Sequence, residues 1–246
     1  MKRTKDKYDL VVVGGAHAGI EAALIAHKMG INVVLVSMDI KSIGRMSCNP
    51  AIGGLAKGQM VKELDVLGGY MAMFADKCTL QSKTLNLSKG RSVWSPRSQI
   101  DKIKYEKTVQ KHIKSVGLPV LEGEAISISE KNGKIESVML SGGKEIFCSS
   151  AVLTCGTFLN GLIHIGDKKI KAGIMGEETS IGITESLKSF GFLSGRLKTG
   201  TPPRIDGTTI DYKKCDVQFG DEPVPVFSFL ASTFFTFSNT DFGFFG

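Results

Sequence analysis

The chain has 246 residues, 42% of them hydrophobic, enough for one large domain, or one and a half, that buries about 70–75% of its unfolded surface. No uninterrupted apolar run reaches the ~18 residues of a transmembrane helix, so no membrane span is expected. The 31 Lys and Arg residues outnumber the 24 Asp and Glu residues, and the net charge of +7 suits an anionic partner such as RNA or phosphate. Ordinary surface charge is the plainer alternative.

The five cysteines are odd in number and scattered, without a CxxC pair, so neither a zinc site nor a disulfide framework is predicted. The histidines also lack partners at ligand spacing, and no metal site is predicted. The basic N-terminus leads directly into strand-like residues and lacks the apolar core and cleavage site of a signal peptide. A reducing cytoplasm is the simplest compartment.

The first forty residues predict a strand, a glycine turn, a helix and a second strand. Tyr8–Val13 is a short run of β-branched character, as in a buried parallel strand. Ile20–Met29 has apolar residues at helical spacing and ends at Gly30, and Ile31–Val36 reads as the second strand. This order begins a doubly wound α/β sheet, the Rossmann-like fold.

The turn Gly14-Gly-Ala-His-Ala-Gly19 departs from the GxGxxG pattern in one place. Gly14 is expected to make the tight turn, and Gly19 to let helix and strand pack closely. Ala16 stands where a glycine normally lets the backbone approach a pyrophosphate. A dinucleotide site is predicted, with a purely structural turn as the alternative. The acid that usually ends the second strand and binds a ribose is replaced by Ser37, and Asp39 comes two residues later, so the ribose contact stays open.

Twelve residues from Ser47 to Gly58 combine one thiol, an Asn-Pro break and a glycine-rich loop that carries a lysine. Gly53 and Gly54 permit a backbone that can lie against a flat ring or a phosphate. An amphipathic helix is predicted over Gln59–Leu67, and a strand over Leu118–Ile128.

With these motifs in order and at matching spacing over roughly residues 8–230, the chain resembles the GidA/MnmG family of tRNA-modifying flavoproteins. The stretches that carry the resemblance are Val13-Gly-Gly-Ala-His-Ala-Gly19, Met46-Ser-Cys-Asn-Pro-Ala-Ile-Gly-Gly54, Leu85-Asn-Leu-Ser-Lys-Gly90, Gly156-Thr-Phe-Leu-Asn-Gly161, Ile163-His-Ile-Gly166 and Gly195-Arg-Leu-Lys-Thr-Gly-Thr-Pro-Pro-Arg-Ile-Asp206.

The resemblance implies an FAD enzyme that also uses NADH and methylene-tetrahydrofolate. Together with a GTPase partner, MnmE, it would add a (carboxymethyl)aminomethyl group to C5 of the wobble uridine (U34) of certain tRNAs, as a cytoplasmic homodimer. The implied fold is a glutathione-reductase-like FAD-binding fold, incomplete here, over residues 1–195. Residues 196–230 would start an inserted domain. Residues 231–246 form a divergent tail, in a stretch from 227 onward that holds eight of the 14 Phe.

Carried over by motif, the cofactor-binding residues fall in three places. Ala125 matches a backbone contact on the adenine side, and Ser180 a flavin contact, although Ser180 also fits the N-cap of a helix over Ile181–Phe190. The FAD pyrophosphate would be held by Gly14, Gly15, Ala16, His17, Ala18 and Gly19.

Cys48 is the candidate nucleophile, because uracil C5 becomes reactive once a thiolate adds at C6. Arg45 and Lys57 lie close in sequence and would lower the thiol pKa. Packing of a small residue near the flavin is the alternative. Arg196, Lys198 and Arg204 flank a Pro-Pro turn and are predicted to hold a folate carboxylate or a tRNA phosphate. The alternative there is a plain linker into the inserted domain. An Arg usual in the family is replaced by Ile174.

Three interpretations therefore compete. The first is the tRNA-modifying enzyme, favoured by the Cys-Asn-Pro and Pro-Pro-Arg motifs. The second is a folate- and FAD-dependent tRNA uridine methyltransferase, which shares the opening fold. The third is a truncated, non-catalytic FAD-binding fragment, favoured by the shortness of the chain relative to the family and by its tail.

Overall fold

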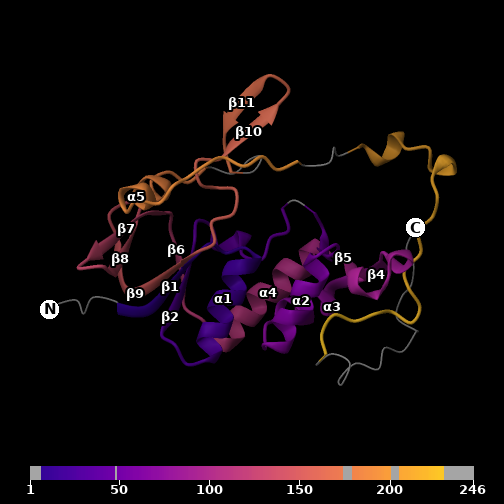
Figure 1. Cartoon of the computed structure of the whole chain (residues 1–246), viewed down its shortest axis with the longest axis horizontal. Coiled ribbons are helices and arrows are strands. Elements are labelled where there is room, and N and C mark those ends of the chain that lie inside the picture. The colour runs from indigo at the N-terminus through magenta and orange to yellow at the C-terminus, as the bar shows by residue number, and fades with distance from the viewer. Residues whose placement is uncertain (1–6, 48, 174–178, 201–204, 230–246) are drawn as a thin grey trace. The chain divides into compact units, whose positions relative to one another are not determined.

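The computed structural model describes residues 7–47, 49–173, 179–200 and 205–229. The chain divides into two compact units, each with its own sheet (Figure 1). The first unit combines residues 1–49 with 106–214, and the second combines 50–105 with 215–246. The predicted functional boundaries after residues 195 and 230 divide the chain differently and remain a prediction.

A six-stranded sheet in the order β6-β2-β1-β9-β8-β7 forms the centre of the first unit. Its parallel part consists of β1 (Lys7–Val13), β2 (Val33–Ser37), β6 (Val120–Glu122) and β9 (Glu145–Leu153). Its antiparallel part adds β8 (Lys134–Leu140) and β7 (Ala125–Lys131). The central strands are apolar in a continuous run because they are buried: Val11, Val12, Val34, Leu35 and Val36 have no exposed surface. The predicted doubly wound α/β start is confirmed.

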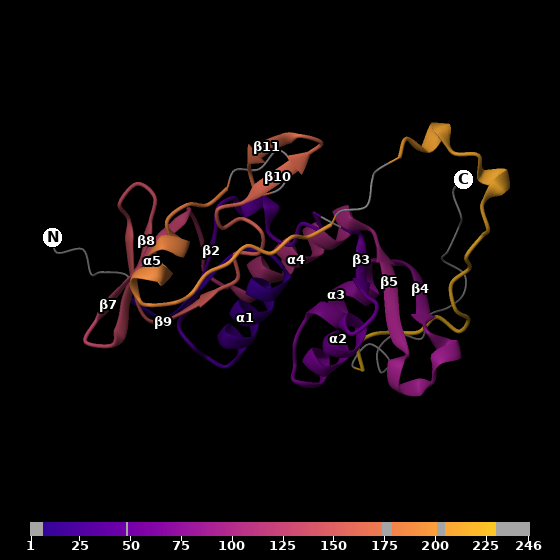
Figure 2. The same cartoon turned by 45° about the horizontal axis from the view of Figure 1, so that its top comes forward.

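Helix α1 (His17–Lys28) follows β1 directly and contacts β1, β2 and β9. It turns Ile20, Ala23 and Leu24 inward, which is the apolar spacing that predicted it. The helix begins three residues before the predicted start, and Gly30 follows it with a φ of +77°, as the predicted glycine stop requires. The other helices with residues in this unit are α4 (Lys102–Val116), which begins in the second unit, and α5 (Ile183–Ser189), which contacts β7 (Figure 2).

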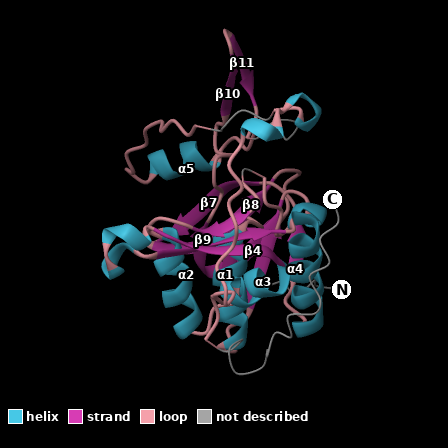
Figure 3. Ribbon diagram, turned by 90° about the vertical axis from the view of Figure 1, so that its right-hand side faces the viewer, coloured by secondary structure: helices cyan, strands magenta, loops and turns pink. Residues whose placement is uncertain are grey.

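A hairpin of β10 (Leu162–Ile165) and β11 (Lys168–Lys171) also belongs to the first unit and extends away from the six-stranded sheet (Figure 3). Both strands of the hairpin are short, and β11 is exposed along its whole length. The described single-turn 3-10 segments are η1 (Ile40–Ser42), η2 (Leu87–Lys89), η3 (Arg91–Val93), η4 (Gly207–Thr209) and η5 (Tyr212–Lys214).

The prediction of one strand over Leu118–Ile128 is wrong. This stretch contains β6 and β7, which lie at opposite edges of the six-stranded sheet. The break falls at Gly123, where a Cβ would lie 2.6 Å from a methyl carbon of Leu140. A side chain at the point where the chain leaves β6 would therefore require the end of the Leu140 side chain to shift.

The second unit contains the antiparallel sheet β3-β5-β4, formed by β3 (Ala51–Gly53), β5 (Ser95–Ile100) and β4 (Thr79–Leu85). Two helices accompany it, α2 (Lys57–Val66) and α3 (Met71–Cys78). The predicted helix over Gln59–Leu67 is confirmed and begins two residues earlier. Phe74 and Tyr105 meet edge to face in the core of this unit, with ring centroids 6.2 Å apart.

Candidate cofactor site

The glycine turn after β1 has the geometry that its sequence predicted. Gly14 has a φ of +114°, which an L side chain rarely adopts, and its amide donates to the Val36 carbonyl oxygen at 2.8 Å. A Cβ on Gly19 would collide with the Gly14 carbonyl oxygen, so α1 packs on the turn as closely as a glycine allows. The Thr154 hydroxyl donates to the Val13 carbonyl oxygen at 2.7 Å and fixes the end of β9 to the turn. The predicted roles of Gly14 and Gly19 are confirmed.

The N-terminus of α1 is arranged to receive an anion. The first intrahelical hydrogen bond runs from the Ile20 amide to the Ala16 carbonyl oxygen at 3.0 Å, so the amides of Ala18 and Gly19 come before any intrahelical partner. No acidic residue occupies the first turn. Burial lowers the pKa of half-buried His17, which favours its neutral form. The attraction for an anion therefore comes from backbone amides and the helix dipole.

Ala16 is the N-cap of α1, with φ −87° and ψ −178°. Any L residue adopts this extended conformation, so the alanine that replaces the expected glycine introduces no backbone strain. Its methyl group is the only difference that a phosphate group at the turn would meet. Whether that methyl weakens binding remains a prediction.

The end of β2 carries no carboxylate directed at the turn. Ser37 is buried, its hydroxyl donates to the Asp39 carbonyl oxygen at 3.0 Å, and a Cβ on Gly15 would lie 2.9 Å from the same hydroxyl oxygen. The Asp39 carboxylate accepts the Lys41 amide at 2.8 Å and caps η1. Ser37 thus occupies the place of the usual ribose-binding acid without a carboxylate, and the carboxylate of Asp39 is engaged in the cap of η1.

Two of the predicted cofactor residues meet each other. The Ser180 hydroxyl donates to the Ala125 carbonyl oxygen at 3.4 Å, and both residues are buried. The helix α5 begins two residues later than predicted, with Gly182 as its N-cap, so the alternative of Ser180 as the N-cap is wrong. The flavin contact of Ser180 and the adenine contact of Ala125 remain predictions.

Asn160 joins these residues to a predicted substrate residue, and sequence reasoning gave it no role. It has a φ of +48°, and its amide donates to the Ser180 carbonyl oxygen at 2.9 Å. Its carbonyl oxygen accepts the Arg196 guanidinium at 2.9 Å, and its side chain donates to the Glu185 carboxylate at 2.9 Å. The available signal was the asparagine at the end of Gly156-Thr-Phe-Leu-Asn-Gly161, since Asn tolerates the left-handed region.

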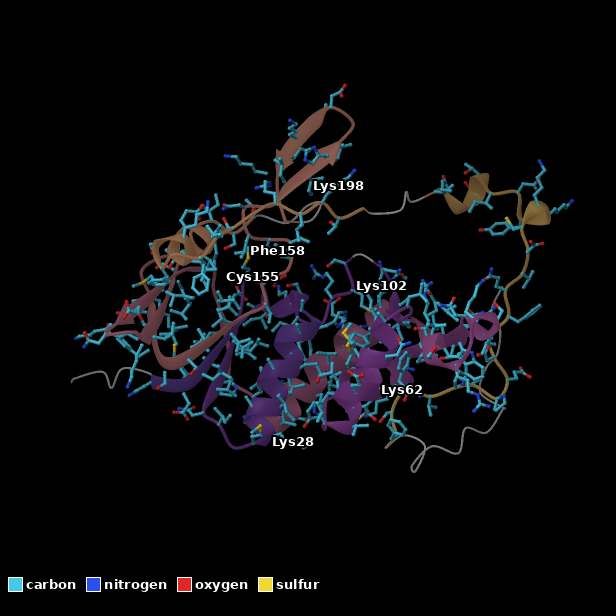
Figure 4. All side chains as sticks on the ribbon, viewed as in Figure 1. Lys28, Lys62, Lys102, Cys155, Phe158 and Lys198 are labelled. Atoms are coloured by element: carbon cyan, nitrogen blue, oxygen red, sulfur yellow. The ribbon has the colours of Figure 1, made fainter. Side chains whose placement is uncertain are left out.

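Cys155 and Phe158 lie in the segment that leads from β9 to the hairpin, and Lys198 lies near the base of the hairpin (Figure 4). Burial raises the pKa of the Cys155 thiol, and this residue packs against the core of the six-stranded sheet. Lys198 is exposed.

Some predicted residues are not among those described. Cys48, Arg204 and Ile174 lie outside the described residues. The loop that follows Cys48 belongs to the second unit and packs on Pro96 of β5: the Gly54 amide donates to the Pro96 carbonyl oxygen at 2.9 Å. A Cβ on Gly58 would lie 2.9 Å from Pro96 Cδ. Close packing on β5 therefore accounts for part of the glycine content of this loop.

Within the described ranges, no group of three or more His, Cys, Asp or Glu side chains is arranged to hold a metal ion. No described helix has the length and apolar character needed to cross a membrane. The described cysteines are all free thiols, of which Cys78 and Cys148 are buried and Cys215 is exposed.

The parallel sheet, the glycine turn and the open N-terminus of α1 define a Rossmann-like fold of the FAD-binding type. The sequence profile of the family described as Glucose inhibited division protein A matches residues 9–241, so the chain belongs to the GidA family.

Two curated relatives are both named tRNA uridine 5-carboxymethylaminomethyl modification enzyme MnmG. The one from Karelsulcia muelleri is 47% identical over 227 residues, and the one from Cytophaga hutchinsonii is 48% identical over 228 residues. Each alignment covers 92% of this chain and 37% of the relative. The chain therefore spans about 37% of the length of these relatives.

The solved structure of Aquifex aeolicus GidA in its form II crystal is 44% identical, with a TM-score of 0.88 over 93% of this chain and 38% of that chain. A GidA-related protein from Thermus thermophilus shares the fold at 15% identity, with a TM-score of 0.52 over 76% of this chain and 69% of that chain. The predicted FAD-type fold and the predicted family are confirmed.

Proposed function

We propose that this chain is the FAD-binding part of an enzyme that modifies C5 of the wobble uridine (U34) in tRNA by adding a (carboxymethyl)aminomethyl group. The observation that carries the proposal is the 47% identity, across 92% of the chain, to a relative named for this modification. The site supports it, because the turn after β1 has the glycine geometry of a dinucleotide-binding fold.

The residues present fit FAD. The amides of Ala18 and Gly19, at the dipole-positive end of a helix without early acids, would hold the pyrophosphate together with Gly14, Gly15, Ala16 and His17. Ala125 would contact the adenine side through its backbone, and Ser180, whose hydroxyl donates to the Ala125 carbonyl oxygen, would contact the flavin. FAD, when bound, supplies the capacity to accept a hydride from NADH and pass it on.

The protein's own contribution to the reaction is assigned to Cys48. As a thiolate it would add to uracil C6, which makes C5 nucleophilic toward a one-carbon unit from methylene-tetrahydrofolate. Arg45, whose guanidinium pairs with Glu106 at 3.5 Å, carries positive charge three residues before this thiol in the sequence. Arg196, Lys198 and Arg204 would hold the folate carboxylate or a tRNA phosphate.

The partners follow from the same family. We assign tRNA as substrate, the GTPase MnmE as the protein that works with this one, a homodimer as the assembly and the cytoplasm as the compartment. The net charge of +7 is in keeping with an RNA substrate.

The first test is the visible absorption spectrum of the purified chain after incubation with FAD and desalting. Retained flavin bands are expected, because the turn and α1, which would hold the pyrophosphate, lie within one compact unit. A soluble, folded and colourless chain would contradict the cofactor assignment for this chain.

The second test is mass spectrometry of unmodified tRNA after incubation with the chain, MnmE, GTP, NADH and methylene-tetrahydrofolate. Modified U34 supports the proposal. A product that carries only a 5-methyl group would instead support the methyltransferase, and a flavin-bound chain without a product would support the non-catalytic fragment. Cys48→Ser is expected to abolish modification with FAD retained, whereas Cys215→Ser, a matched change at an exposed thiol, leaves it intact.

A further inference from the structure

The end of β2 lacks the carboxylate that usually binds the ribose of an adenosine cofactor. In this fold class an acid about 20 residues after the glycine turn accepts the ribose hydroxyls. Here Ser37 packs under Gly15 and donates to the Asp39 carbonyl oxygen, and the Asp39 carboxylate caps η1. Ser37 and Asp39, the two candidates from the sequence, therefore form hydrogen bonds within the turn that follows β2.

The neighbouring strand ends in the acid that β2 lacks. Glu122 is the last residue of β6, and it is the register partner of Ser37 in the parallel pair β2–β6. The Gly123 amide donates to the Ser37 carbonyl oxygen at 2.9 Å, which fixes this register. Paired residues of adjacent parallel strands project to the same face of a sheet, and the strands lie ~4.8 Å apart. The carboxylate of Glu122 therefore stands one strand away from the usual position, at the same level and on the same face.

The contacts of Glu122 agree with this direction. Its Oε2 accepts the Ile40 amide at 3.3 Å, so the carboxylate reaches over the carboxyl end of β2 toward η1. Among the described residues no other group donates to this carboxylate, and Glu122 is exposed. An ionised carboxylate offers about four lone-pair sites, so further hydroxyl donors can be accepted without loss of the Ile40 contact.

We propose that Glu122 accepts hydrogen bonds from the ribose hydroxyls of the adenosine half of FAD, in place of an acid at the end of β2. This inference rests on the proposed FAD binding. Glu122 would then be a cofactor-positioning residue. The GxGxxG pattern does not point to it, because this acid lies on the next strand in the sheet and 85 residues after Ser37 in the sequence.

The test compares binding of ADP and 2′,3′-dideoxy-ADP by isothermal titration calorimetry, which isolates the ribose hydroxyls without flavin chemistry. In the wild-type chain, the dideoxy compound is expected to bind about tenfold more weakly, the effect of a hydrogen bond to a charged group. In Glu122→Ala and Glu122→Gln this difference is expected to shrink to about twofold or less. Glu122→Gln keeps an acceptor for the Ile40 amide and covers the case in which Glu122→Ala fails to fold.

Glu136→Ala, which removes an exposed carboxylate from β8 in the same unit, is the matched control and is expected to preserve the wild-type difference. An undiminished ribose preference in folded Glu122 variants overturns the inference while the FAD proposal stands. A Glu122 effect that vanishes with inosine diphosphate assigns the residue to the adenine amine and also overturns it. A wild-type chain that binds neither ADP nor FAD overturns both.

Discussion

The side-chain amide of Asn160 donates to the carboxylate of Glu185 at 2.9 Å, while the backbone of Asn160 holds Ser180 and Arg196. This contact lies where the segment after β9 meets the start of α5. Through its backbone contacts, Asn160 joins Ser180, which is assigned to the cofactor, with Arg196, which is assigned to the substrate. The hydrogen bond from Asn160 is the largest cause that lowers the pKa of Glu185.

Asn160→Ala is expected to destabilise the first unit by about 1 kcal/mol, because alanine tolerates the left-handed region less well than asparagine. A depressed Glu pKa contributes stability that is present above the unfolded value of 4.5 and is lost as the pH falls through the folded value. The difference between wild type and variant should therefore shrink from pH 6 to pH 3 in urea unfolding. Asn160→Gly keeps the backbone geometry without the amide. If it matches wild type at every pH, the side-chain contact contributes nothing.

The stability that Asp76 contributes to the second unit depends on pH in the opposite direction. Its two oxygens accept the amides of Phe227 and Ser228, each at 2.9 Å, but burial raises its pKa more than these bonds lower it. A raised pKa contributes stability that is fully present below the unfolded value of 3.8 and is lost as the pH rises through the folded value.

Replacing Asp76 by Asn removes this titration. The difference in free energy of unfolding, wild type minus Asp76→Asn, is expected to fall as the pH is raised from 3 to 7, measured by urea unfolding at each pH. Asp216→Asn, at an exposed position in the same unit, makes the same change in charge. A difference that stays flat, or that follows the Asp216 control, would contradict the role of burial.

The parts of the fold that sequence reasoning predicted are those with a local physical signature. Gly14 and Gly19 are recognisable because a positive φ and a close helix approach each demand a residue without a side chain. Glu122-Gly-Glu124 interrupts the apolar run from 118 to 128, but this local signal does not say that the chain moves from one sheet edge to the other, so the separation of β6 from β7 was missed. Asn160 was missed because its partners lie 20 to 36 residues further along the chain.

Ala56, the N-cap of α2, has a φ of +60° and a ψ of −36°. A positive φ costs a non-glycine residue about 1–2 kcal/mol. Ala56→Gly is therefore expected to raise the free energy of unfolding by about 1 kcal/mol. The change Ala72→Gly, at a buried position inside helix α3, is expected to lower it by at least about 1 kcal/mol, because helix propensity and a buried methyl group are both lost. Chemical denaturation of both variants checks the signs, and a loss of stability in Ala56→Gly would show that the turn gains nothing from glycine.

The methyl group of Ala16 gives the last prediction. Because the backbone of Ala16 is extended and unstrained, Ala16→Gly brings no relief of backbone strain. Its FAD affinity is nevertheless expected to rise about tenfold, since overpacking by one methylene group costs ~1–3 kcal/mol. Ala18→Gly, two residues further into the turn, serves as the control and should not tighten binding. Fluorescence titration with FAD measures both variants. Equal affinity of Ala16→Gly and wild type would mean that the pyrophosphate approaches the turn without meeting this methyl group.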